Sequence, residues 1–224
     1  MRRSCPDPPR LHQTGSNLPL RTYPQQGLAW RMRTHSRSRT VSPRMTSTSP
    51  LRYSGVAIAL HWLLALALVA SFTLGSFMTE LETSPLKLRL YNWHKWAGVT
   101  ILALSLARLL WRLSHRPPAD PPMPLWQQRA AHATHRLLYV LFFAVPLSGW
   151  AYSSAAGHPV VLFGVLPLPD LVSADRAFAK AIRPLHGWLA DGLAVLVALH
   201  VAAAVKHHLI DRDGLLGRMW PLRA

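Results

Sequence analysis

The sequence predicts an all-α membrane protein, a four-transmembrane-helix bundle with both termini in the cytoplasm. Three observations lead to this fold class. Half of the 224 residues are hydrophobic. The apolar residues gather in four stretches, each long enough to cross a bilayer as a helix of about 20 residues. Proline-rich segments separate these stretches, and a chain that crosses lipid must satisfy its backbone hydrogen bonds internally, so each stretch is expected to be a helix.

The four predicted spans differ in the charges that they carry. The first and third contain no formal charge. The second carries Lys95 near one end and Arg108 and Arg112 near the other, where long side chains reach the membrane interface. The fourth contains Asp191, which we interpret as a hydrogen-bonded polar group near the interface, with proton transfer as the alternative. The predicted spans are 56–78, 91–113, 137–156 and 184–205.

Prolines mark the connections between the spans, at 79–90, 114–136 and 157–183, because proline breaks helices. Pro146 lies inside the third span and is expected to kink it. Pro184 suits the first turn of the fourth helix.

The distribution of basic residues predicts the orientation. Counted from residue 45, nine Lys and Arg lie on the side of the N-terminus, the 114–136 connection and the C-terminal tail, and six lie on the other side. The positive-inside rule therefore places both termini in the cytoplasm. The formal charge of +16 would also suit a nucleic-acid partner, but four apolar spans favour a membrane protein with cytoplasmic arginine, and we expect no nucleic-acid partner.

The chain is expected to have two parts, an arginine-rich leader over 1–50 and a helical domain over 51–220. Residues 1–44 carry nine Arg and one acid and no long apolar run, so the leader is expected to be disordered and is not a secretory signal. Met45 begins a short polar lead into the first span. We hypothesise that translation starts there.

Four histidines lie within the apolar spans. His186 and His200 share the fourth span and are fourteen residues apart, so on a helix they are separated by roughly 21 Å and lie within about 40° of one face. His61 lies in the first span and His94 in the second. Ionisable residues in a membrane are costly and usually face the bundle interior, so four of them at two depths indicate a bound cofactor.

The predicted depths of these histidines in the membrane divide them into two pairs. Antiparallel neighbours place His61 and His200 near the cytoplasmic ends of their helices and His94 and His186 near the outer ends. Cys5 is the only cysteine, which excludes covalent haem attachment through C-x-x-C-H and a four-cysteine iron–sulfur site. The pattern predicts two non-covalent haems, with iron ligated by the pairs His61/His200 and His94/His186. Gly98, one turn after His94, either makes room for a flat macrocycle or permits close helix packing.

Several segments together resemble the bacterial cytochrome b561 family over about residues 50–220. They are RYSGVAIALHWL (52–63), NWHKWAG (92–98), LARLLWRL (106–113), RAAHATHRLLYVLFFAVPLSGW (129–150), IRPLHGWLADG (182–192) and LHVAAAVKHHLIDRDGLLGRM (199–219). The resemblance implies a multi-pass protein of the bacterial inner membrane whose four family haem ligands fall on His61, His94, His186 and His200. It also implies electron transfer to or from the quinone pool, and some family members are superoxide:ubiquinone oxidoreductases.

Three functions follow as hypotheses. The first is a di-haem cytochrome, an oxidoreductase that carries electrons between a periplasmic donor, such as superoxide, and ubiquinone. Its partners would be membrane lipid, quinone and a small-molecule or protein electron donor. The second is a haem-bearing membrane anchor subunit of a dehydrogenase or hydrogenase complex. The third is a non-redox metal-binding membrane protein that uses His132, His135, His207 and His208.

Overall fold

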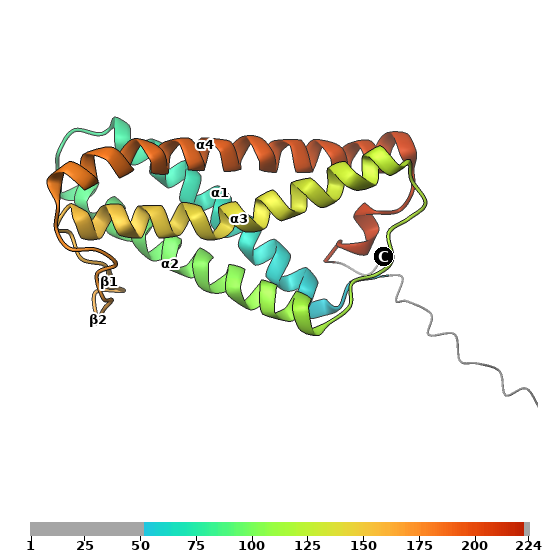
Figure 1. Ribbon diagram of the computed structural model, residues 1–224, viewed down its shortest axis with the longest axis horizontal. Coiled ribbons are helices and arrows are strands. Elements are labelled where there is room, and N and C mark those ends of the chain that lie inside the picture. The colour runs from blue at the N-terminus through green and yellow to red at the C-terminus, as the bar shows by residue number, and fades with distance from the viewer. Residues whose placement is uncertain (1–51, 222–224) are drawn as a thin grey trace, which may run out of the picture. The chain divides into compact units, whose positions relative to one another are not determined.

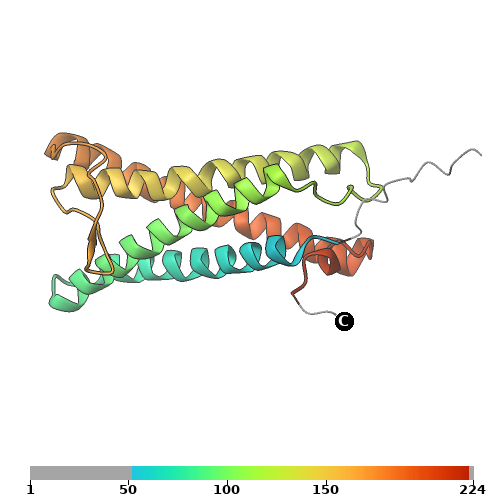
Figure 2. The same cartoon turned by 90° about the horizontal axis from the view of Figure 1, so that it is seen from below.

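The computed structural model describes residues 52–221. The leader predicted over 1–50, its disorder and the start at Met45 lie outside these residues. Within them the chain forms four long helices and a small hairpin (Figures 1 and 2). All four helices are long and apolar enough to cross a membrane. The helices are α1 (Gly55–Glu80), α2 (Pro85–Ser114), α3 (Leu125–Ala155) and α4 (Arg176–Lys206).

Side-chain caps fix where three of the helices begin. The Ser54 hydroxyl accepts a hydrogen bond from the backbone N–H of Ala57 at 3.3 Å, at the start of α1. Ser84 does the same for α2, and the Asp175 carboxylate accepts from two backbone N–H groups of α4 at 2.8 and 3.1 Å. Such caps satisfy N–H groups that have no partner within the helix.

Three helices begin six or more residues earlier than the hydropathy predicts, and the first of them, α2, begins at Pro85 rather than at 91. Helix α3 begins at Leu125 rather than at 137, and α4 begins at Arg176 rather than at 184. Hydropathy detects the part of a helix that matches the hydrocarbon, whereas the helix itself extends to its cap or to a preceding proline. Pro184 therefore lies inside α4 and not in its first turn, which corrects that expectation, and Pro146 lies inside α3 as expected.

The connection between α3 and α4 contains a hairpin that the sequence does not predict. Strand β1 (Val161–Leu162) pairs antiparallel with β2 (Leu166–Pro167). The turn requires positive φ at Phe163 (53°) and Gly164 (74°), a conformation that glycine adopts without steric cost. The indole N–H of Trp96 donates to the Val161 carbonyl at 2.7 Å, which fixes the hairpin against α2.

The two ends of the bundle have different neighbours, and we name them accordingly. The hairpin end carries β1 and β2, the last turns of α1 and α3 and the first turns of α2 and α4 (Figure 1). The terminal end carries the start of α1 and the end of α4, which continues into η1 (His207–Asp211) and η2 (Leu216–Arg218). There the Trp62 indole donates to the Met219 carbonyl at 2.8 Å, so the C-terminal segment returns to α1.

The main core cluster is a layer contributed by all four helices. It comprises Leu64, Ile101, Leu138, Phe142 and Leu193. Leu193 lies seven residues after His186 and seven before His200, so this layer lies midway between the two predicted histidine pairs. The closest backbone approaches join α1 with α2, α2 with α3 and α3 with α4. Helix α4 stands farther from α1 and α2, which leaves space between helices for a bound group.

Candidate cofactor-binding site

The structure brings the four span histidines together in the two predicted pairs. The ring centroids of His61 on α1 and His200 on α4 are 6.3 Å apart, near the terminal end. Those of His94 on α2 and His186 on α4 are 6.2 Å apart, near the hairpin end. The rings of each pair are steeply inclined, at 69° and 82°. Helix α4 thus contributes one imidazole to each pair.

The backbone of α1 holds the His94 ring. Its Nδ1 lies 3.1 Å from the Ser71 carbonyl oxygen and 3.3 Å from the Ser71 hydroxyl. The ring also covers Gly75, one turn later on α1, where an added Cβ would lie 3.0 Å from His94 Cε1. A carbonyl oxygen only accepts hydrogen bonds, so Nδ1 carries the proton and Nε2 is left as a lone-pair donor.

The backbone of α3 holds the His186 ring in the same way. His186 Nδ1 lies 3.1 Å from the Val145 carbonyl oxygen and 3.1 Å from the Ser148 hydroxyl. An added Cβ at Gly149 would lie 2.9 Å from His186 Cε1. In both cases a carbonyl accepts from the ring and the glycine four residues later lets the ring approach. A hydrogen bond at Nδ1 orients a ligating imidazole and raises its basicity.

A cavity of about 280 Å³ lies beside this pair. Both His94 and His186 line it, and apolar side chains of all four helices, including Ile101, Phe142 and Leu193, form most of its remaining wall. Gly98 also lies in the wall, and a Cβ added there would meet nothing within 4 Å. Such an apolar pocket with a few convergent polar groups is typical of a cofactor site.

Different side chains surround the pair at the terminal end. The His135 ring of α3 lies 5.4 Å from that of His200, so a third imidazole joins the pair. The guanidinium of Arg108 on α2 lies within electrostatic range of His61, His135 and His200. The Arg108 Nη1 atom is buried and has no hydrogen-bond partner among residues 52–221.

These residues fit a haem with two axial histidines. A bond from imidazole to a transition metal is roughly 2.0 Å long, so two imidazoles on opposite sides of one ion place their centroids roughly 6 Å apart, as in both pairs. The proton on Nδ1 at His94 and His186 leaves Nε2 for the metal. The apolar wall suits a porphyrin, and the buried Nη1 atom of Arg108 suits an anionic substituent.

Two further histidines of the terminal end, His132 and His207, have carboxylate partners. His132 Nε2 lies 2.9 Å from an Asp120 carboxylate oxygen, and the Gln128 amide donates to the same oxygen at 3.3 Å. Partial burial alone would raise the pKa of Asp120, but the hydrogen bonds from Gln128 and His132, together with the charge of His132 and His135, hold this pKa below its ordinary value.

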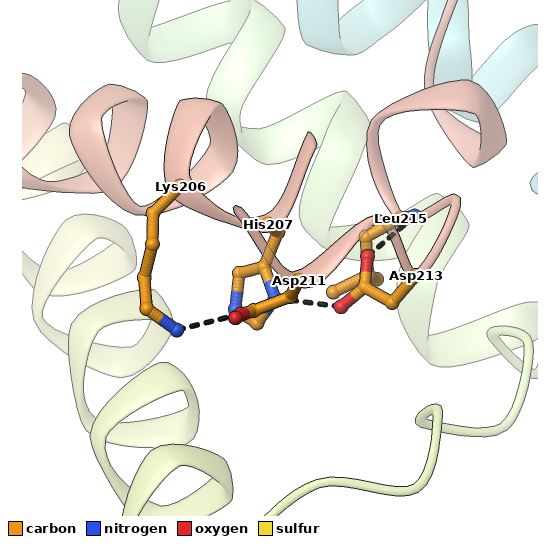
Figure 3. Close-up of polar contacts among 5 residues, drawn as sticks. All are labelled: Lys206, His207, Asp211, Asp213 and Leu215. Carbon is orange, nitrogen blue, oxygen red and sulfur yellow. Dashed lines mark hydrogen bonds and ion pairs between the residues drawn. The ribbon is translucent and has the colours of Figure 1, made fainter. Parts of the chain in front are cut away.

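An ion-pair cluster closes the end of α4 (Figure 3). His207 Nδ1 lies 2.6 Å from an Asp213 oxygen and 3.1 Å from an Asp211 oxygen, and the Lys206 ammonium pairs with Asp211 at 2.6 Å. Within residues 52–221 this is the one group of three His, Cys or acidic side chains gathered closely enough to hold a metal ion. Lys206 already neutralises Asp211, so ion pairing accounts for the cluster without a metal. Of the four histidines proposed as metal ligands, only His207 belongs to it, whereas His132, His135 and His208 do not.

Sequence reasoning missed several residues that surround the histidines. The sequence predicts Arg108 only as an interfacial cation, although a charge within an apolar segment is itself a signal of a functional residue. Gly75 and Gly149 give no such signal in the sequence. Their contact with an imidazole ring depends on which helix packs against their own. The same holds for the hydrogen-bond acceptors Ser71 and Val145.

Comparisons with known proteins identify a family. A family model described as prokaryotic cytochrome b561 matches residues 52–222. The chain is 35% identical over 183 residues to "Cytochrome b561 homolog 2" of Escherichia coli (strain K12). The matched region covers 77% of this chain and 93% of the relative. It is 32% identical over 178 residues to "Cytochrome b561 homolog 1" of the same organism, covering 77% and 98%. It is 30% identical over 174 residues to "Probable superoxide oxidase CybB" of Yersinia pestis, covering 76% and 96%.

Proposed function

The chain belongs to the prokaryotic cytochrome b561 family, and from this premise we propose that it is a di-haem cytochrome that passes electrons between a donor at the hairpin end and the ubiquinone pool. Family membership makes it a multi-pass bacterial membrane haem protein. The observation that carries the finer proposal is the presence of two facing histidine pairs, one toward each end of the bundle, with ring centroids 6.3 and 6.2 Å apart.

Each pair would hold one haem b through the two imidazole Nε2 atoms. Haem supplies an iron that accepts and returns one electron. The residues of the chain orient the ligands and form the surroundings of the site. The Ser71 and Val145 carbonyls keep a proton on Nδ1 of His94 and His186. The apolar wall with Ile101 excludes water from the site.

The separation of the two sites suits a path across the membrane. Fourteen residues of α4 place His186 and His200 roughly 21 Å apart along the helix axis. The core layer with Leu64, Phe142 and Leu193 lies between them.

We infer superoxide as a candidate donor at the hairpin end, which would face the periplasm of the bacterial inner membrane. One relative is named a probable superoxide oxidase, and this end carries six Lys and Arg against four acids, a small net positive charge that attracts an anion. Each superoxide would give up one electron and leave as dioxygen. One ubiquinone would take two such electrons and two protons and leave as ubiquinol.

A spectrum of the purified protein tests the proposal. A dithionite-reduced minus oxidised spectrum, with haem quantified per chain, should show two b-type haems in the wild type and one in His200→Ala. Turnover of superoxide with a soluble ubiquinone analogue should then be lost in the variant. Absence of haem from the wild type would overturn the proposal.

One observation favours a second role, as the haem-bearing membrane anchor of a dehydrogenase or hydrogenase complex. The tip of the hairpin exposes 64% of Phe163 and 84% of Val165, an apolar surface that a partner subunit would cover. Isolation in mild detergent should then yield a stoichiometric dehydrogenase. Turnover by the isolated chain with superoxide and quinone would speak against this role.

A further inference from the structure

A second cavity, of about 420 Å³, opens at the terminal end among the start of α1, the end of α2 and α3. Its wall is strongly basic. None of the residues that line it, all within the described part of the chain, is an acid, and four of them are arginines. These are Arg52, Arg108, Arg112 and Arg116.

Two of these arginines are held in place by Tyr139 of α3. Arg108 Nε donates to the Tyr139 hydroxyl at 3.3 Å, and the Arg112 guanidinium carbon lies 5.9 Å from the centre of the Tyr139 ring. The Arg108 Nη1 atom is buried and has no hydrogen-bond partner among residues 52–221. A buried guanidinium donor is costly unless it is paired, and its preferred partner is a planar carboxylate or a phosphate. The cavity is therefore organised to receive an anion.

The position of Arg108 indicates which anion. Arg108 lies six residues before the end of α2, and His61 lies six residues after the start of α1, so both are roughly 9 Å inside the bundle from the terminal end. Arg108 also interacts electrostatically with His61, His135 and His200. An anion held by Arg108 would therefore lie beside this histidine pair, deeper than a lipid headgroup normally reaches.

We propose that this arginine pocket binds the propionate carboxylates of the haem held by His61 and His200. The inference rests on the proposed di-haem function. Arg108 pairs with a carboxylate through its buried Nη1 atom, and Arg112 adds positive charge nearer the surface. A positive charge at this place stabilises the reduced form of the adjacent iron, so it raises the midpoint potential of that haem and leaves the haem at the hairpin end unaffected.

Redox titration of the purified holoprotein tests the pocket. Arg108→Gln should lower the midpoint potential of one haem, the one that is lost in His200→Ala. We expect the ratio of reduced to oxidised haem at fixed potential to fall about tenfold, which corresponds to about 59 mV for one electron. Arg108→Lys keeps the charge and should restore most of the potential. Arg112→Gln should shift the same haem in the same direction by a smaller amount.

Arg129→Gln is the matched control. It removes one exposed arginine from the same end of the bundle, outside the residues that line the cavity, and should shift neither potential. Redox-difference infrared spectra with haem labelled at its propionate carboxylates should show a band shift in Arg108→Gln and not in Arg129→Gln. Loss of the terminal-end haem alone in Arg108→Gln, with recovery in Arg108→Lys, would also support the pocket.

Other results would overturn the assignment. Two haems at wild-type potentials in both Arg108→Gln and Arg112→Gln would exclude a propionate site. If anionic phospholipid that copurifies with the wild type were then lost from Arg108→Gln, the pocket would be a headgroup site instead. Absence of haem from the wild type would overturn the proposed function itself and not the pocket alone, so the two failures are distinguishable.

Discussion

Gly75 and Gly149 determine how closely two imidazole rings approach the neighbouring helices. Each glycine lies four residues after a carbonyl that accepts from a histidine Nδ1, the Ser71 carbonyl for His94 and the Val145 carbonyl for His186. A larger side chain at the glycine would cover the approach to that carbonyl. The tautomer of each imidazole, and therefore its capacity to bind a metal through Nε2, depends on a residue that carries no functional group.

Replacing Gly149 should therefore weaken haem binding at the hairpin end. In Gly149→Ala the new Cβ would lie 2.9 Å from His186 Cε1, closer than van der Waals contact, so the ring must move and its hydrogen bond to Val145 must lengthen. We expect the affinity for that haem to fall about tenfold or more. Haem retention per chain during dilution and the low-spin electron paramagnetic resonance signal would measure this.

Gly192→Ala provides the control, because Gly192 also lies in a helix and an added Cβ there would meet nothing within 4 Å. It should retain both haems with an unchanged spectrum. Equal haem retention in Gly149→Ala and Gly192→Ala would show that the ring does not depend on close approach to α3.

At the scale of elements, the connection between α2 and α3 is tied to the start of α3 by one carboxylate. Asp120 accepts hydrogen bonds from Gln128 and His132, both in the first turns of α3. The two side chains of the His132–Asp120 pair are about half exposed, at 50% and 48%, so solvent screens the interaction and its contribution to stability is small. The pair still makes the stability of this junction depend on pH.

Asp120→Asn should remove that dependence. Because the folded-state pKa of Asp120 lies below its ordinary value of about 3.9, the stabilisation is present above that ordinary value and is lost as the pH falls through the folded-state pKa. Thermal midpoints of wild type and variant should differ slightly near neutral pH and converge below about pH 4. Asp170→Asn, an exposed acid of the α3–α4 connection, is the control. A difference that stays constant down to low pH would contradict the prediction.

At the scale of the whole molecule, the two ends differ in charge and in shape. The terminal end holds the arginine pocket and the ion-pair cluster after α4. The hairpin end presents exposed apolar side chains. A donor and an acceptor would therefore meet different surfaces, provided that the bundle is inserted in one orientation.

The orientation is testable by cysteine labelling in a Cys5→Ser background. Val165→Cys is on the exposed hairpin, where the native residue is 84% exposed, and Leu125→Cys is at the start of α3, where the native residue is 69% exposed. A membrane-impermeant maleimide should label Val165→Cys in intact spheroplasts and Leu125→Cys only after lysis. The reverse pattern would place the termini outside the cytoplasm.

The sequence by itself determined the number of helices, because a span of about 20 apolar residues has no other stable structure in lipid. It also predicted which histidines would share a depth, since helical rise is fixed at about 1.5 Å per residue. The depth of a residue along its helix does not say which faces of the helices meet. The tertiary structure decided this. Packing between helices brought Gly75 and Gly149 against the imidazoles of His94 and His186 and left the Nη1 atom of Arg108 buried near the other pair. These contacts join residues far apart in the chain, where no periodic pattern in the sequence records them.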